Sequence, residues 1–140
     1  ILGGANENQQ GALCEYGVKL GTAFQLIDDV LDFTADEEVL GKAAGADLLG
    51  GKVTLPLIYL LEADGSMYEI VQRVLLNGEY AQTDRQQLVS ALNRTGSLER
   101  ARALACNYAQ AARDSLECLP GSPYCESLRA LPTYVLDRDR

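Results

Sequence analysis

NQQGALCEYGVKLGTAFQLIDDVLDF, residues 8–33, is the longest helical pattern in the chain, and it decides the fold class. Its apolar and small residues recur with i, i+3, i+4, i+7 spacing, the period of a helix that is buried on one side. These residues are Leu13, Tyr16, Gly17, Leu20, Phe24, Ile27 and Leu31. A further flank carries Ala23, Leu26, Val30 and Phe33. Because most of its circumference is apolar, we expect this helix to lie in the middle of a bundle.

The remainder of the chain also has helical periodicity, with breaks at glycine and proline. We expect helices over residues 55–62, from 66 to about 78, from 84 to 96, from 97 to about 119 and from 123 onward. No stretch alternates apolar and polar residues as a strand would. The sequence therefore predicts an all-α fold, in one domain over residues 1–140.

Capping residues indicate where several of these helices begin. The expected N-caps are Ser66, Ser97 and Ser122. Asp84 followed by Gln87 indicates a capping box, in which each side chain binds the backbone of the other residue. Pro132 has no backbone N–H, so we expect it to kink or shorten the last helix.

The composition is that of an acidic globular protein. Its net charge of −8 argues against a nucleic-acid partner, because such a partner selects a basic surface. No apolar run approaches the roughly 18 residues of a transmembrane segment. The chain has no histidine and no C-x-x-C motif, which disfavours zinc. Cys14, Cys106 and Cys118 lie in helical patterns, where we expect buried free thiols and a reducing, cytoplasmic setting.

Three aspartates share one stripe of the first helix. At about 100° per residue, the stripe contains Gly21, Gln25, Asp28, Asp29 and Asp32. Carboxylates that face the interior of a bundle repel one another and lose hydration, and divalent cations remove that conflict. Asp28 and Asp32, at i and i+4, can share Mg²⁺, while Asp29 at the edge can bind it or act through water.

Other interpretations of this stripe are weaker. A solvated acidic face is the ordinary alternative, but the flanks of the helix are too apolar for a surface position. An EF-hand calcium loop would need alternating aspartates followed by glycine. A ferritin-like di-iron centre would need histidine. Magnesium with a phosphorylated ligand is therefore the favoured interpretation of the stripe.

The segment after the first helix is rich in glycine and carries two lysines. Lys42 and Lys52 provide charges suited to phosphate oxygens, and the glycines let the backbone approach a ligand. Thr54 is expected to cap the following helix, whose N-terminus favours an anion. The segment lacks the G-x-x-x-x-G-K-[ST] pattern of a Walker A loop. It supplies the positive half of a metal and diphosphate site.

Four motifs together resemble the second aspartate-rich region of the trans-isoprenyl diphosphate synthases. They are FQLIDDVLD at 24–32, LGK at 40–42, GADL at 45–48 and GKVTLP at 51–56. The bacterial octaprenyl-type branch is the most similar. The resemblance is dense over residues 3–61 and continues as a helical pattern to the end of the chain.

This resemblance implies an all-α bundle around a deep cavity, usually in a homodimer. It implies the Mg²⁺-dependent head-to-tail condensation of an allylic diphosphate with isopentenyl diphosphate. Asp28 and Asp32 would bind the metal, with Asp29 in support. Gln25 and Lys42 would be catalytic, and with Lys52 they would bind the diphosphate and stabilise its departure.

The chain lacks several motifs that the family has. The family has another aspartate motif on an earlier helix, with arginines and a Lys-Thr pair, and these are missing. The chain also opens with Ile1 and has no initiator methionine. We expect a C-terminal part with about half of an active site and no activity alone. Its apolar flanks Leu26, Val30 and Phe33 would be exposed, which favours association with another copy or with the missing half.

Three alternatives stay open. The chain could be a non-catalytic subunit of a heteromeric synthase, although the intact aspartate stripe counts against that. It could be a helical interaction module with solvated acids. A class I terpene cyclase shares metal and diphosphate chemistry, but the two glycine-lysine segments fit it poorly.

Overall fold

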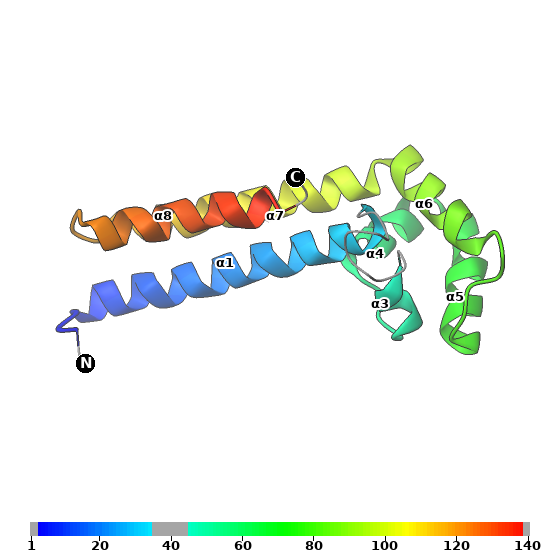
Figure 1. Ribbon diagram of the computed structural model, residues 1–140, viewed down its shortest axis with the longest axis horizontal. Helices are drawn as coiled ribbons and strands as arrows, with labels where there is room; N and C mark the ends of the chain where they lie inside the picture. The colour runs from blue at the N-terminus through cyan, green and yellow to red at the C-terminus, as the bar shows by residue number, and fades with distance from the viewer. Residues whose placement is uncertain (1–2, 35–44, 139–140) are drawn as a thin grey trace. The chain divides into compact units, whose positions relative to one another are not determined.

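The protein is all-α in the computed structural model, which describes residues 3–34 and 45–138. No strand occurs in these two ranges. The elements are α1 (Glu7–Thr34), α3 (Ala46–Leu49), α4 (Leu55–Ala63), the 3₁₀ helix η1 (Gly65–Met67), α5 (Tyr68–Asn77), α6 (Asp84–Thr95), α7 (Ser97–Ser115) and α8 (Pro123–Leu136) (Figure 1). The predicted fold class is confirmed, and α1 and α4 agree with the predicted ranges to within a residue.

Of the caps predicted at Ser66, Asp84, Ser97 and Ser122, only the one at Ser122 is right. The Ser122 hydroxyl accepts the N–H of Cys125 at 3.1 Å, as predicted. Ser66 instead lies inside η1, where its own N–H donates to the Asp64 carboxylate at 3.1 Å. At α6, Thr83 holds the N-cap position, and Asp84 is the first helical residue. The capping box fails because the Asp84 carboxylate binds an arginine from another helix.

The bounds of α7 also differ from the prediction, and α8 does not stop at Pro132. α7 begins at Ser97 itself and ends at Ser115 rather than near residue 119. α8 continues through Pro132 to Leu136. Proline at position 132 leaves the carbonyl oxygen of Leu128 without its usual helical donor. The hydroxyl of Tyr16 on α1 donates to this oxygen at 2.7 Å, so the helix does not have to stop.

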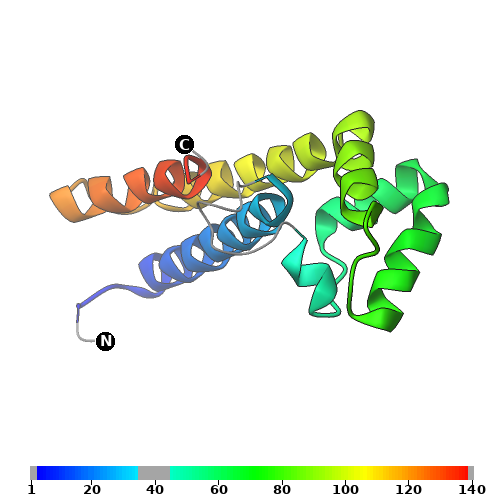
Figure 2. The same ribbon diagram turned by 45° about the vertical axis from the view of Figure 1, so that its right-hand side comes forward.

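Contacts divide the chain into two compact units. Unit 1 comprises Ile1–Ile27 and Leu104–Arg140, and unit 2 comprises Asp28–Ala103. In unit 1, α7 and α8 lie along α1 (Figures 1 and 2). Its core contains Tyr16, Ala112, Leu116 and Cys125. Fully buried alanines at 105, 109 and 112 give α7 a smooth face that allows close packing.

Unit 2 gathers α3, α4, α5 and α6 around the last two turns of α1 and the start of α7 (Figure 2). Its core includes Val30, Phe33, Leu48, Leu57, Leu60, Ile70, Val71, Val74, Leu88, Leu92 and Leu98. Val30 is 3% exposed and Phe33 is 4% exposed. The expectation that these two side chains are exposed is therefore wrong, because unit 2 covers that flank of α1 itself.

The burial of the cysteines differs from what their helical patterns predicted. All four are free thiols, and Cys14, Cys106 and Cys118, which were expected to be buried, are exposed. Cys125 is buried in the core of unit 1. Helical periodicity placed these residues on helices or at their ends without showing which face is covered. Among the described residues, no helix is both long and apolar enough to cross a membrane.

Candidate functional site

Asp32 lies in the last turn of α1, and its carboxylate meets the start of α3. Its Oδ1 accepts the backbone N–H of Ala46 at 3.0 Å, and its Oδ2 accepts that of Asp47 at 3.2 Å. The backbone N–H of Gly45 also donates to the main-chain oxygen of Asp32, at 2.7 Å. Two of the first N–H groups of a helix therefore hold this carboxylate in one orientation, because they have no partner within the helix.

The turn before α3 requires glycine at position 45. Gly45 has a φ of +81°, in the left-handed region that side chains disfavour. A Cβ atom there would lie 2.2 Å from the hydroxyl oxygen of Tyr80, far inside van der Waals contact. That hydroxyl donates to the Gly45 carbonyl oxygen at 2.8 Å. The close approach of Tyr80 and the backbone geometry both exclude a side chain.

Asp47, at the start of α3, forms an ion pair with Lys52. The Lys52 ammonium lies 2.9 Å from Asp47 Oδ1, and the backbone N–H of Lys52 donates to the Asp47 carbonyl oxygen at 2.9 Å. The Lys52 side chain is 70% exposed, so the pair is open to solvent on the lysine side. A cation is thus held beside Asp47.

Burial shapes the ionisation of the aspartates. It raises the pKa of the Asp29 carboxyl, and the charge of Asp47 raises it further, while the N–H of Leu55 opposes the shift. Burial also raises the pKa of the Asp32 carboxyl, against the lowering effect of its two N–H donors. Both acids are therefore less stable in their charged form than a solvated carboxylate. A nearby cation would relieve this.

The hydrogen bond to Asp47 raises the pKa of the Lys52 ammonium, and the charges of Asp29 and Asp32 act in the same direction. Lys52 therefore remains protonated at neutral pH. The site presents an exposed positive charge next to acids that are partly withdrawn from water.

Asp28 and Asp32 carry carboxylate oxygens, which are the ligands that Mg²⁺ takes together with water and phosphate oxygens. Within residues 3–34 and 45–138, no three acidic or cysteine side chains are arranged to hold a metal ion by themselves. Mg²⁺ typically takes one or two carboxylates, several waters and phosphate oxygens. Asp28 is half-buried one turn before Asp32 on the same helix, which supplies such a pair.

The other predicted residues have different positions. Gln25 is exposed on α1, in the part of the helix assigned to unit 1. Lys42 lies outside the described residues. Thr54 is the N-cap residue of α4, as expected, but its side chain makes no capping hydrogen bond. Its Oγ1 is buried without a hydrogen-bond partner among the described residues.

The structure adds Gly45, Asp47 and Tyr80 to the predicted set. The G-x-D pattern at 45–47 was part of the family resemblance, and it is the signal that could have assigned roles to the first two residues. No local pattern marks Tyr80. It reaches Gly45 only through the fold, from 35 residues away in the chain.

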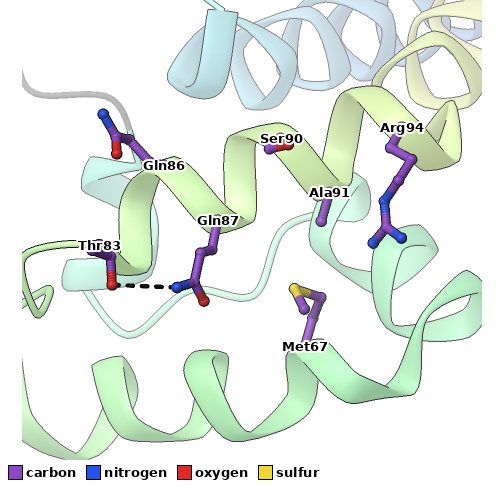
Figure 3. Close-up of a pocket in the computed structure, with 7 residues that line it drawn as sticks. All are labelled: Met67, Thr83, Gln86, Gln87, Ser90, Ala91 and Arg94. Atoms are coloured by element: carbon purple, nitrogen blue, oxygen red, sulfur yellow. Dashed lines mark hydrogen bonds between the residues drawn. The ribbon is translucent and has the colours of Figure 1, made fainter.

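A separate hollow of about 430 Å³ opens on α6 in unit 2 (Figure 3). It is lined by Met67, Thr83, Gln86, Gln87, Ser90, Ala91 and Arg94. Arg94 is the one charged side chain among these described residues, and it pairs with Asp64. The hollow lacks the carboxylates and lysines that a metal-bound diphosphate requires, so it is a less suitable candidate than the aspartate site.

Comparison with known proteins gives the same family as the motifs. The family model described as Polyprenyl synthetase matches residues 1–92. The chain is 40% identical over 139 residues to a prenyl transferase of Synechocystis sp., and the match covers 99% of the chain and 42% of that protein. It is 39% identical over 140 residues to the octaprenyl diphosphate synthase of Escherichia coli, covering 100% of the chain and 43% of that protein.

A solved structure is similar along nearly the whole chain. It is the polyprenyl synthase of Caulobacter crescentus in complex with calcium and isoprenyl diphosphate. The TM-score is 0.84 at 33% identity, and the match covers 98% of this chain and 42% of that one. The chain thus spans less than half the length of the relatives that it matches.

Proposed function

Because the chain belongs to the polyprenyl synthetase family, we propose that it supplies the diphosphate-binding part of a trans-prenyl diphosphate synthase active site. The reaction of the complete enzyme would be the head-to-tail condensation of an allylic diphosphate with isopentenyl diphosphate. The observation that carries the proposal is the Asp32 carboxylate, held between the N–H groups of Ala46 and Asp47. It is pre-oriented on the helix that also carries Asp28 and Asp29.

In this proposal each residue has a separate role. Asp28 and Asp32 would hold Mg²⁺, with Asp29 beside them. The bound metal would supply charge neutralisation on the leaving diphosphate. Lys52 would hydrogen-bond to diphosphate oxygens, and Gln25 and Lys42 would do the same and stabilise the departing group.

Titration with Mg²⁺ and inorganic pyrophosphate tests the binding site directly. A ligand that binds only the folded state raises the melting temperature, so we expect a rise when both are present. Asp28→Asn should remove most of this rise. Asp137→Asn, at the exposed end of α8, is the matched control and should retain it. An unchanged melting temperature in the parent chain would overturn the proposal and favour an interaction module.

We also propose that condensation needs residues beyond this chain, since its relatives are more than twice as long. The purified chain should form no elongated product from an allylic diphosphate and labelled isopentenyl diphosphate. Activity should appear when a chain with the remaining family residues is added. Elongation by the 140 residues alone would contradict this. Unchanged activity of the reconstituted enzyme with Asp28→Asn would instead favour a non-catalytic subunit.

Association is the third part of the proposal, either between copies or with the remaining part of a synthase. Large apolar side chains are exposed in both units, among them Val18 at 65% and Leu76 at 78%. Association removes such side chains from water, which lowers the free energy. Sedimentation should show concentration-dependent association. A strictly monomeric chain at all concentrations would contradict it.

A further inference from the structure

The peptide unit that joins Gly45 to Ala46 is hydrogen-bonded at both of its polar groups. Its carbonyl oxygen accepts the Tyr80 hydroxyl at 2.8 Å, and its N–H donates to Asp32 Oδ1 at 3.0 Å. One rigid peptide plane therefore links Tyr80 to the carboxylate. Because hydrogen bonds in series polarise one another, donation to this carbonyl strengthens the N–H as a donor.

Tyr80 is held where it can make this contact. Its side chain is half-buried, and the guanidinium of Arg85 lies over its ring, 5.2 Å from the centroid. Burial and the charge of Asp32 raise the pKa of the Tyr80 hydroxyl to about 12. The hydroxyl therefore keeps its proton at neutral pH and can only donate to the carbonyl oxygen.

The segment that carries Tyr80 is anchored by an ion pair. Asp84, 2% exposed, binds Arg73 on α5 through two hydrogen bonds, of 2.7 Å and 3.2 Å. The same carboxylate accepts the N–H of Ala81 at 3.1 Å. The residue that follows Tyr80 is thus fixed to both α5 and α6, so the tyrosine is placed by the core of unit 2.

We propose that Tyr80 is a positioning residue for the aspartate site, which orients the Asp32 carboxylate through the Gly45–Ala46 peptide without touching the ligand. This inference rests on the proposed function, in which Asp32 holds the metal that is shared with a diphosphate. Groups behind the metal ligands commonly change metal affinity by about 10- to 100-fold. Because Tyr80 acts through a peptide, we expect a smaller effect.

Tyr80→Phe in the 140-residue chain tests the inference because it removes only the hydroxyl. With inorganic pyrophosphate present, the affinity for Mg²⁺ should fall by about 3- to 10-fold, measured by calorimetry at a temperature where the variant is folded. The amide proton signals of Ala46 and Asp47 should move upfield in NMR spectra, since their hydrogen bonds weaken. Tyr68→Phe, 57% exposed on α5, is the control and should change neither quantity.

Two outcomes separate this inference from its premise. If Asp28→Asn abolishes Mg²⁺ and pyrophosphate binding while Tyr80→Phe leaves affinity and both amide signals unchanged, the positioning role is wrong and the proposed function stands. A lowered melting temperature alone would then mark Tyr80 as purely structural. If Asp28→Asn also leaves binding unchanged, both proposals fail.

Discussion

Two tyrosines make nearly the same hydrogen bond, one in each unit, and with different consequences. In unit 1 the Tyr16 hydroxyl donates to the Leu128 carbonyl oxygen at 2.7 Å, and in unit 2 Tyr80 donates to that of Gly45 at 2.8 Å. The first satisfies an oxygen that Pro132 leaves without a donor. The second holds a peptide whose N–H faces Asp32. In unit 1 the hydrogen bond satisfies a carbonyl oxygen within α8, whereas in unit 2 it fixes the peptide that binds the Asp32 carboxylate.

Gly45→Ala should have the largest effect, because it breaks the unit 2 arrangement at its tightest point. It adds a left-handed backbone cost and a Cβ atom 2.2 Å from the Tyr80 oxygen. We expect a loss of about 3 kcal/mol in the free energy of unfolding, measured with urea. Gly51→Ala is the control, since its φ is +82° with nothing within 4 Å of the Cβ position. It should cost only about 1 kcal/mol. Equal losses in the two variants would show that contact with Tyr80 is unimportant.

Asp84→Asn should cause the second largest loss in the free energy of unfolding, because it removes the charge that anchors the Tyr80 segment. Breaking a buried pair costs about 3–5 kcal/mol, and we expect about 2 here since the Arg73 side chain is 47% exposed. The hydrogen bond from Arg73 lowers the pKa of the Asp84 carboxyl below its usual value of about 3.9.

The effect of Asp84 should therefore depend on pH. Its stabilisation is complete above its unfolded pKa and is lost as pH falls through the folded one. Unfolding free energies of the parent chain and Asp84→Asn should differ at pH 7 and converge in strong acid. A difference that stays constant down to pH 2 would contradict the assignment.

Tyr16→Phe should have a moderate effect in unit 1, where the tyrosine is 6% exposed. It leaves the Leu128 carbonyl oxygen unsatisfied, so we expect a loss of about 1 kcal/mol. Pro132→Ala restores a helical N–H, and combined with Tyr16→Phe it should make that loss smaller. Tyr134→Phe, 72% exposed, should change little. Strict additivity of the first two substitutions would show that Tyr16 does not compensate for Pro132.

Asp29→Asn should have the smallest effect on stability, and of opposite sign. Asp29 is partly buried beside Asp47, so neutralising it should raise the unfolding free energy, by only about 0.5 kcal/mol because solvent screens a half-exposed charge. The same change should weaken binding of Mg²⁺ with pyrophosphate. A variant that is both less stable and equally good at binding would show that the carboxylate has a structural role instead.

Sequence patterns predicted the helices well and their caps less well. The α1 range followed from apolar periodicity, which reports local geometry and burial of one face. The capping box at Asp84 failed because its carboxylate binds the charged Arg73 and the N–H of Ala81, which precedes α6, and no N–H group of α6 itself. The exposure of Cys14 and the burial of Val30 could not be read from periodicity, since a period shows which residues share a face and not what covers it.

The sequence by itself determined the all-α fold class, the family and the aspartate stripe at Asp28, Asp29 and Asp32, because spacing along one helix is local. Only the tertiary structure decided which groups meet the Asp32 carboxylate. Its N–H donors lie 14 and 15 residues away, and Tyr80 lies 35 residues from the glycine that it binds. Such contacts depend on how the core of unit 2 packs, and hydrogen bonds that are formed by packing leave no period in the sequence.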